Sequence, residues 1–135
     1  MKDEKLYRVM DANLNRAKEG LRVCEDICRF VYDHRQWTNG FKTIRHQLTA
    51  AAVRIGILKL VAARHIEGDV GKKTVNSELA RKKIDDIFYA NAQRVKESVR
   101  VLEEFAKLKD RRTAEDFKKL RYLMYAIEKK ITAQG

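Results

Sequence analysis

The chain has 135 residues, of which 44% are hydrophobic and 36% are charged, and its formal net charge is +11 at pH 7. This hydrophobic fraction excludes a disordered chain, and the lack of proline with only 6 glycines argues against an all-β fold. No apolar run is long enough to cross a membrane and no segment resembles a signal peptide, so we expect a cytoplasmic protein that does not bind membranes. The positive charge favours an anionic partner: a nucleic acid, a nucleotide or a phosphorylated metabolite.

Four stretches of the chain carry apolar residues at helical spacing. We expect the first helix over about residues 4–33 and the second over about 41–63. The third is expected over about residues 77–108, and the fourth begins near Ala114. Regular seams on four long helices predict an all-α fold of the four-helix-bundle kind.

Short polar breaks join these helices in pairs, so that each pair forms an antiparallel helical hairpin. The breaks are residues 34–40 and residues 109–115. Thr38 or Asn39 is the expected N-cap of the second helix, and Thr113 is that of the fourth.

The two hairpins repeat one another in sequence. Residues 12–25, ANLNRAKEGLRVCE, recur as residues 90–103, ANAQRVKESVRVLE. Residues 41–45, FKTIR, recur as residues 117–121, FKKLR. A repeat made of core residues would concern the fold alone, but this one preserves Asn, Arg and Glu, which cost free energy to fix in place. It therefore predicts a site built from both halves.

The same pattern gives the organisation of the chain. We expect one domain over residues 1–135, with repeat 1 at about 5–63, a linker at 64–76 and repeat 2 at about 77–133.

The first and third helices each carry a second, partly apolar face that bears an arginine and lies more than about 90° from the bundle seam. A solvent-exposed face would not need these apolar side chains. The face therefore packs against a second subunit, which would make the protein a homo-oligomer, or it lines a cleft. The charged residues also have the spacing of ordinary surface ion pairs. The two faces consist of Val9, Arg16, Val23 and Phe30, and of Ile87, Arg94, Val101 and Leu108.

The linker is the part of the chain that has no copy. Residues 67–73 read EGDVGKK. Glycines let backbone amides approach phosphate oxygens, Lys72 adds positive charge, and Asp69 could hold Mg²⁺. A plain turn between hairpins explains the motif equally well. The sequence contains no P-loop, no G-x-G-x-x-G motif and no zinc-type cluster.

Residues 11–26, 67–71 and 90–104 resemble a small kinase family of thiamine biosynthesis, the monofunctional hydroxymethylpyrimidine phosphate kinases. Its members occur alone or fused in front of thiamine phosphate synthase. The resemblance covers almost the whole chain. It implies an ATP-dependent kinase that uses Mg²⁺ and converts hydroxymethylpyrimidine phosphate to the diphosphate.

The resemblance also implies roles for individual side chains. Arginines would bind phosphates, acidic groups would bind or position Mg²⁺, and asparagines would orient the substrate. The family commonly has an acidic residue after Arg64 and Thr after Asp-Val-Gly, where this chain has His65 and Lys72. The expected catalytic residues are Arg16, Arg94, Glu19 and Glu97, the expected substrate- and phosphate-binding residues are Asn13, Asn91, Arg22, Arg100, Arg64, Gly71 and Lys72, and the expected metal ligand is Asp69.

Two other classes of function fit the sequence. A basic helical module could bind nucleic acid without catalysis, although the chain has no helix-turn-helix or RNP motif and we do not expect nucleic acid as its partner. A structural bundle could dimerise through the second apolar faces. Affinity for arbitrary DNA or RNA that falls steeply with salt would indicate the first class, and a dimer that binds no ligand would indicate the second.

Overall fold

The computed structural model describes residues 3–73 and 81–134. Its elements are α1 (Asp3–Asp26), the π-helical turn η1 (Ile27–Val31), α2 (Arg35–Ile55), α3 (Ile57–Ala62), α5 (Ile84–Ala106) and α6 (Arg111–Gln134). These residues contain no β-strand, and the all-α prediction is confirmed. None of their helices combines the length and the apolar character that a membrane span requires.

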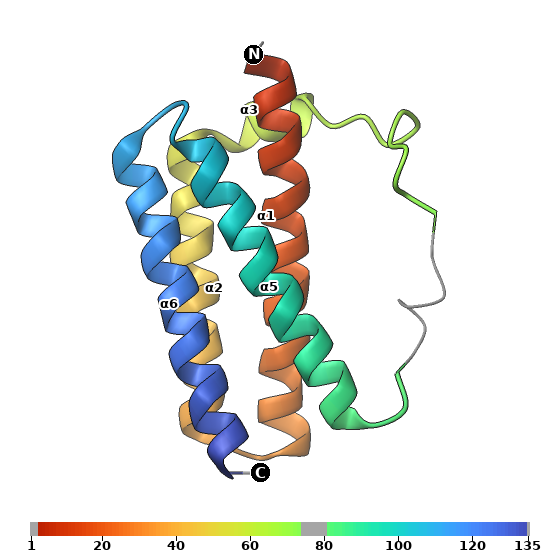
Figure 1. The fold of residues 1–135 in the computed structure, drawn as a ribbon, viewed down its shortest axis with the longest axis vertical. Coiled ribbons are helices and arrows are strands. Elements are labelled where there is room, and N and C mark those ends of the chain that lie inside the picture. The colour runs from red at the N-terminus through yellow and green to blue at the C-terminus, as the bar shows by residue number, and fades with distance from the viewer. Residues whose placement is uncertain (1–2, 74–80, 135) are drawn as a thin grey trace.

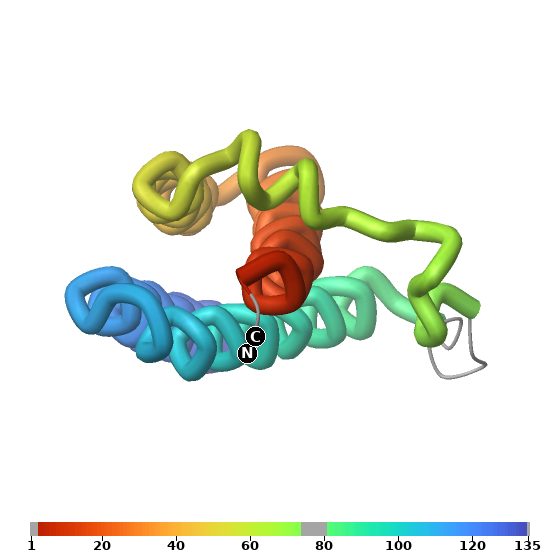
Figure 2. The backbone as a smooth tube through the Cα atoms, turned by 90° about the horizontal axis from the view of Figure 1, so that it is seen from above, coloured from red at the N-terminus to blue at the C-terminus, as the bar shows by residue number. Residues whose placement is uncertain are grey.

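The four long helices form a bundle of two antiparallel hairpins. In Figure 1, α1 and α2 run side by side in opposite directions, and so do α5 and α6. The most extensive contact is between α1 and α5, which cross at the centre, while α6 packs against both α5 and α2. The linker leaves α3, passes α1 and reaches round on the side away from α6 (Figure 2). One side of α1 therefore faces the linker and not another long helix.

The core follows the apolar seams of the sequence. Each long helix contributes a fully buried large side chain: Leu21 from α1, Phe41 from α2, Phe88 from α5 and Phe117 from α6. The rings of Phe41 and Phe88 meet edge to face with centroids 5.9 Å apart. Burying such a side chain stabilises the fold by roughly 2–3 kcal/mol. The equivalent residues Phe41 and Phe117 occupy equivalent core positions, so the repeat is present in the packing.

Gly20 sets the distance between α1 and α5. A Cβ atom at this position would lie 2.8 Å from Cγ2 of Val95 and 3.0 Å from the carbonyl oxygen of Asn91. No side chain fits there without displacing the α5 backbone. The close approach brings the repeated polar segments of the two helices to one crossing point.

The second helix begins and ends earlier than the sequence indicated. Its N-cap is His34, whose Nδ1 accepts a hydrogen bond of 3.1 Å from the amide of Trp37, so the expectation of Thr38 or Asn39 was wrong. Thr38 lies in the first turn, and its hydroxyl donates to the His34 carbonyl at 2.8 Å. The helix ends at Ile55 because Gly56 has φ = 113°, and α3 continues at a different angle.

Carboxylates set the starts of the second hairpin's helices. Asp110 precedes α6, and its oxygens accept hydrogen bonds from the Arg112 amide and the Thr113 hydroxyl, so Asp110 is the cap where Thr113 was expected. The Thr113 hydroxyl lowers the pKa of Asp110. Asp86 accepts hydrogen bonds from the amides of residues 82 and 83, and α5 begins at Ile84. The third helix was expected from residue 77; residues 77–80 lie outside the described part of the chain.

A buried ion pair occurs in the same place in both hairpins. Nε of Arg45 in α2 donates to Glu25 in α1 at 2.9 Å, and Nε of Arg121 in α6 donates to Glu103 in α5 at 3.0 Å. Both carboxylates are buried. A buried charge is tolerated when it is paired and hydrogen-bonded, and each of these pairs joins the two helices of its hairpin.

Candidate functional site

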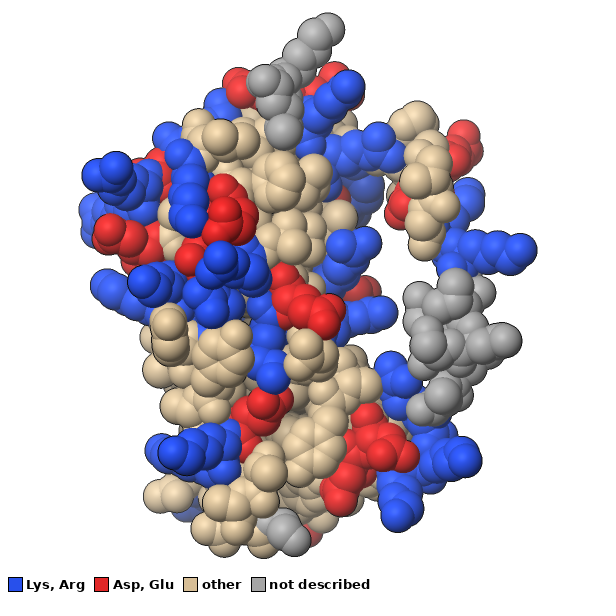
Figure 3. All heavy atoms as spheres, viewed as in Figure 1, with Lys and Arg blue, Asp and Glu red and all other residues tan. Residues whose placement is uncertain are grey.

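A cavity of about 990 Å³ lies between α1 and the first part of the linker. One wall consists of α1 residues between Lys5 and Glu19, and the other consists of linker residues between Arg64 and Val70. Figure 3 shows basic side chains of the bundle bordering a hollow next to the linker. Five of the residues expected at a site line this cavity: Asn13, Arg16, Glu19, Arg64 and Asp69.

Arg64 fastens the linker to α1. Its Nε and Nη2 donate to the two carboxylate oxygens of Asp11, each at 2.8 Å. Asp11 is buried and also accepts a hydrogen bond of 3.2 Å from the side-chain amide of Asn15. The bond to Asp11 raises the pKa of Arg64. Two parallel charge-assisted bonds fix orientation as well as position, so the cavity's two walls are held together at this point.

Asn13 and Arg16 are arranged as a pair on the α1 wall. The Asn13 side-chain amide donates to the Val9 carbonyl at 2.9 Å, which leaves its oxygen to accept a bond of 3.4 Å from Nη1 of Arg16. The copy in the second repeat keeps the first of these bonds, because Asn91 donates to the Ile87 carbonyl at 2.8 Å. The repeated asparagine therefore has a fixed orientation in both halves.

The α1 wall carries positive charge that the described residues do not neutralise. No carboxylate in the described part of the chain forms a salt bridge with Lys5, Arg8 or Arg16. Arg8 instead donates a long hydrogen bond of 3.4 Å to the carbonyl of His65 in the linker. Cations that line a cavity and form no salt bridge are suited to bind an anionic ligand.

Gly71 and Lys72 lie beyond the residues that line the cavity. The amide of Gly71 donates to the carboxylate of Asp69 at 2.9 Å, and the amide of Asp69 donates to the Ile66 carbonyl at 3.1 Å. These bonds give the glycine-rich motif a compact turn. The turn holds Asp69 at the cavity.

The expected residues of the second repeat do not line this cavity. Arg94 and Glu97 are exposed on α5, where Glu97 accepts a hydrogen bond of 2.9 Å from Gln93. Arg22 and Arg100 are exposed beside the buried pairs: Arg22 lies 3.3 Å from Glu25, and Arg100 lies 3.6 Å from Glu103. The repeated charged residues therefore lie in three places. Arg16 and Glu19 line the cavity, Arg94 and Glu97 lie on the surface of α5, and Arg22 and Arg100 lie beside the buried ion pairs.

The carboxylates of the cavity could contribute to a magnesium site only if other ligands completed it. The described residues contain no cluster of three or more His, Cys, Asp or Glu side chains that could hold a metal by themselves. Mg²⁺ commonly keeps several water ligands and meets one or two carboxylates together with substrate phosphates. Asp11 is occupied by Arg64, so Glu19 and Asp69 are the carboxylates left for this role.

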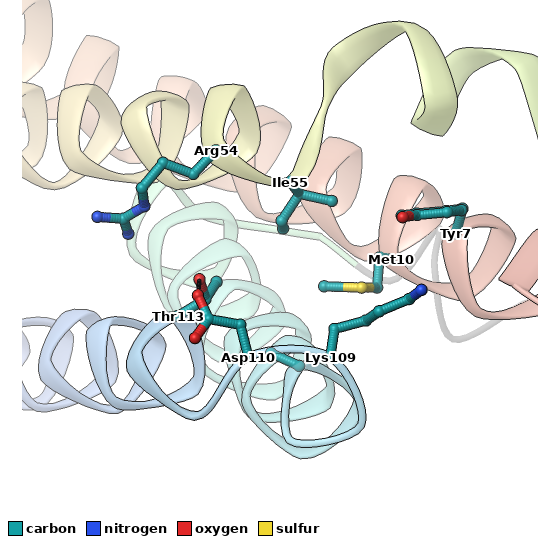
Figure 4. Close-up of a pocket in the computed structure, with 8 residues that line it drawn as sticks. Tyr7, Met10, Arg54, Ile55, Lys109, Asp110 and Thr113 are labelled. Atoms are coloured by element: carbon teal, nitrogen blue, oxygen red, sulfur yellow. Dashed lines mark hydrogen bonds between the residues drawn. The ribbon is translucent and has the colours of Figure 1, made fainter.

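A smaller cavity of about 190 Å³ lies at the end of the bundle. Figure 4 shows the side chains around it, among them Tyr7 of α1, Arg54 of α2 and Lys109 of the turn between α5 and α6. The cations here are paired within the protein, because Lys109 contacts Asp3 at 2.9 Å and Arg54 contacts Asp116. None of the residues selected from the repeat lines this space. The linker cavity is therefore the stronger candidate for a site.

Comparison with protein families places the chain. The model of the ThiD2 family matches residues 8–130. The chain belongs to the ThiD2 family. The matched residues include both hairpins, the linker and all of the residues selected from the repeat.

The chain is also similar to curated proteins named thiamine-phosphate synthase. It is 40% identical over 124 residues to the protein from Synechocystis sp., covering 91% of this chain and 35% of that protein. It is 39% identical over 124 residues to that of Nostoc punctiforme, covering 91% and 34%. With that of Thermosynechococcus vestitus, the identity is 38% over 130 residues, covering 96% and 36%. The chain thus spans about a third of the length of these relatives. No solved structure matches it.

Sequence reasoning missed Asp11, Lys5 and Arg8 as site residues. Asp11 was included in the resembling segment but was not selected, because its position in the second repeat holds Tyr89. The repeat draws attention to side chains that are present in both copies. The difference between Asp11 and Tyr89 is the sequence signal that could have identified Asp11.

Proposed function

We propose that the chain is a kinase of thiamine biosynthesis that transfers the γ-phosphoryl group of ATP to hydroxymethylpyrimidine phosphate and yields the diphosphate. The observation that carries the proposal is the grouping of Asn13, Arg16, Glu19, Arg64 and Asp69 around one cavity. Membership in the ThiD2 family and the names of the relatives support a role in thiamine biosynthesis.

The reaction joins two phosphates. An oxygen of the acceptor phosphate attacks the γ-phosphorus of ATP, the bond from that phosphorus to the β–γ bridging oxygen breaks, and ADP leaves with the bonding electrons. The acceptor oxygen is already anionic, so no strong general base is required, and a proton on the acceptor monoanion would pass to water. The barrier arises from holding several negative groups in line and from the charge that spreads over the transferred group.

The α1 wall suits this task. Arg16 would contact a phosphate, and Asn13 holds the Arg16 guanidinium through the 3.4 Å bond. Arg64 lies on the linker wall, where it is held by Asp11 of α1. It keeps further N–H donors for the same ligand. When bound with ATP, Mg²⁺ would neutralise charge on the β- and γ-phosphates. Glu19 and Asp69 would hold it.

A coupled assay of ADP release tests the proposal. Purified protein with MgATP should release ADP when hydroxymethylpyrimidine phosphate is added, and much more slowly with water or with unphosphorylated hydroxymethylpyrimidine as the acceptor. For the arginine variants described below, Lys118→Ala is the matched control, because it also removes one exposed positive charge. Lys118 lies on α6 and does not line the cavity. Absence of ADP release that depends on the acceptor would reject the proposed activity.

A further inference from the structure

The two repeats differ where repeat 1 lines the cavity. Arg8 corresponds to Asp86, and Asp11 corresponds to Tyr89. Asp86 is used to cap the start of α5, where it binds two backbone amides. At these positions the first copy has a cation, Arg8, and a carboxylate, Asp11, that binds Arg64 of the linker. The second copy has a carboxylate and a tyrosine instead. The two copies therefore present different side chains at these two positions.

The linker gives the same cavity an apolar rim. Ile66 is 66% exposed, Val70 is fully exposed, and both line the cavity opposite α1. Half-buried Val9 adds an apolar group from α1. Ligand sites commonly combine apolar walls with a few polar groups that fix orientation. A cavity with a cationic wall and an apolar rim fits a ligand that has a polyanionic end and a flat apolar ring.

The pair of Arg64 and Asp11 places this rim next to the first repeat. Arg64 is bound to Asp11, and the turn from Ile66 to Asp69 follows directly. Tyr89, at the equivalent position of repeat 2, has no carboxylate with which to hold an arginine. The cavity volume of about 990 Å³ is at the upper end of the roughly 300–1,000 Å³ that is typical of small-molecule sites, which leaves room for a ligand as large as a nucleoside triphosphate.

We propose that the cavity of the first repeat is the nucleotide subsite of the proposed kinase. The triphosphate lies along Lys5, Arg8 and Arg16, and the base packs against Ile66 and Val70. This assignment rests on the proposed function and adds to it the part of the molecule that binds the nucleotide.

The internal repeat supplies a matched pair of variants. Arg16→Ala and Arg94→Ala remove the same side chain from equivalent positions. Binding of the magnesium complex of a non-hydrolysable ATP analogue should be measured by calorimetry, with helical circular dichroism to confirm folding. Arg16→Ala should weaken binding roughly 10- to 100-fold, as expected for loss of a hydrogen bond to a charged group. Arg94→Ala should weaken it less than about threefold.

A second variant tests the apolar rim. Val70→Ser should weaken binding of the ATP analogue and leave binding of inorganic tripolyphosphate unchanged, because tripolyphosphate has no base. A larger loss of nucleotide affinity in Arg94→Ala than in Arg16→Ala would overturn the assignment but leave the kinase proposal intact. Equal losses would show a composite site and also overturn it. If the unaltered protein binds no nucleotide, both proposals fail.

Discussion

Arg64 donates two hydrogen bonds of 2.8 Å to Asp11, whereas the equivalent position in the second repeat holds Tyr89, which has no carboxylate. A duplicated bundle offers two similar half-sites, but phosphoryl transfer needs a donor and an acceptor that differ. The Asp11–Arg64 pair assigns the linker to one half-site and so breaks the symmetry.

Loosening this pair should weaken use of the nucleotide. Asp11→Asn removes the charge and leaves Arg64 one acceptor oxygen, so the linker should be held less firmly. We expect the KM for ATP to rise about tenfold, the loss of one charge-assisted interaction, with a smaller change in kcat. Limited proteolysis should also cut the linker faster. Asp116→Asn, which breaks the pair with Arg54 away from the cavity, is the control. Unchanged KM and proteolysis would make the contact incidental.

Removing the repeated arginines should reduce catalysis more than stability. Arg16 and Arg94 are exposed and form no salt bridge within the described residues, so they contribute little to folding. If each contacts a phosphate in the transition state, alanine should lower turnover at least about 10²-fold. Thermal melting and the steady-state rate should be measured on the same samples. Near-normal turnover with a much lower melting temperature would make these arginines structural.

The buried ion pairs should have the opposite effect. Glu103→Gln leaves the Arg121 guanidinium in the α5–α6 seam without its counter-charge. We expect the free energy of unfolding to fall by about 3 kcal/mol, near the lower end for breaking a buried pair. Glu104→Gln removes an exposed carboxylate on the next residue and should cost less than about 1 kcal/mol. Urea unfolding distinguishes the two, and equal losses would contradict a seam role for Glu103.

Asp69 should affect the metal requirement. Asp69→Asn keeps the size of the side chain and an oxygen for the Gly71 amide but removes the charge. Turnover should fall, and a higher Mg²⁺ concentration should be needed for half-maximal rate, while the melting temperature stays the same. The rate is measured across a Mg²⁺ titration at constant ATP. Superimposable titration curves would leave Asp69 as a turn residue.

The second apolar faces predict self-association. Phe30 is 63% exposed and Leu108 is 62% exposed, whereas Val9 lines the cavity. We expect a homodimer that Phe30→Glu or Leu108→Glu weakens, because a charge would be buried in the contact. Leu58→Glu, at an exposed position of α3, is the control. Sedimentation velocity measures the association. A monomeric parent protein at high concentration would mean that these faces serve only the cleft.

The architecture could be predicted because the apolar seams are long and regular. Leu21, Phe41, Phe88 and Phe117 belong to these seams, and all four are fully buried in the core. Helix ends were less predictable because caps depend on single side chains. His34 and Asp110 act as caps, and no local pattern ranked them above the nearby threonines.

The candidate site could be predicted only in part. Asn13 and Arg16 stood out because they are repeated, and they do meet Arg64 and Asp69 at one cavity. Repetition could not separate them from Arg22 and Arg100, which lie beside the buried carboxylates Glu25 and Glu103. A duplicated motif copies residues of the seam and of the site alike, and only the three-dimensional contacts distinguish them.

In the proposed reaction, the γ-phosphoryl group of ATP moves to the phosphate of hydroxymethylpyrimidine phosphate. The most direct measurement follows the labelled γ-phosphate of ATP in the presence of the protein, Mg²⁺ and this acceptor, with the products separated and examined by phosphorus NMR. We predict that the label enters a pyrimidine diphosphate with two coupled phosphorus signals, together with one equivalent of ADP. Label that appears only as inorganic phosphate, or that stays in ATP, would contradict the account.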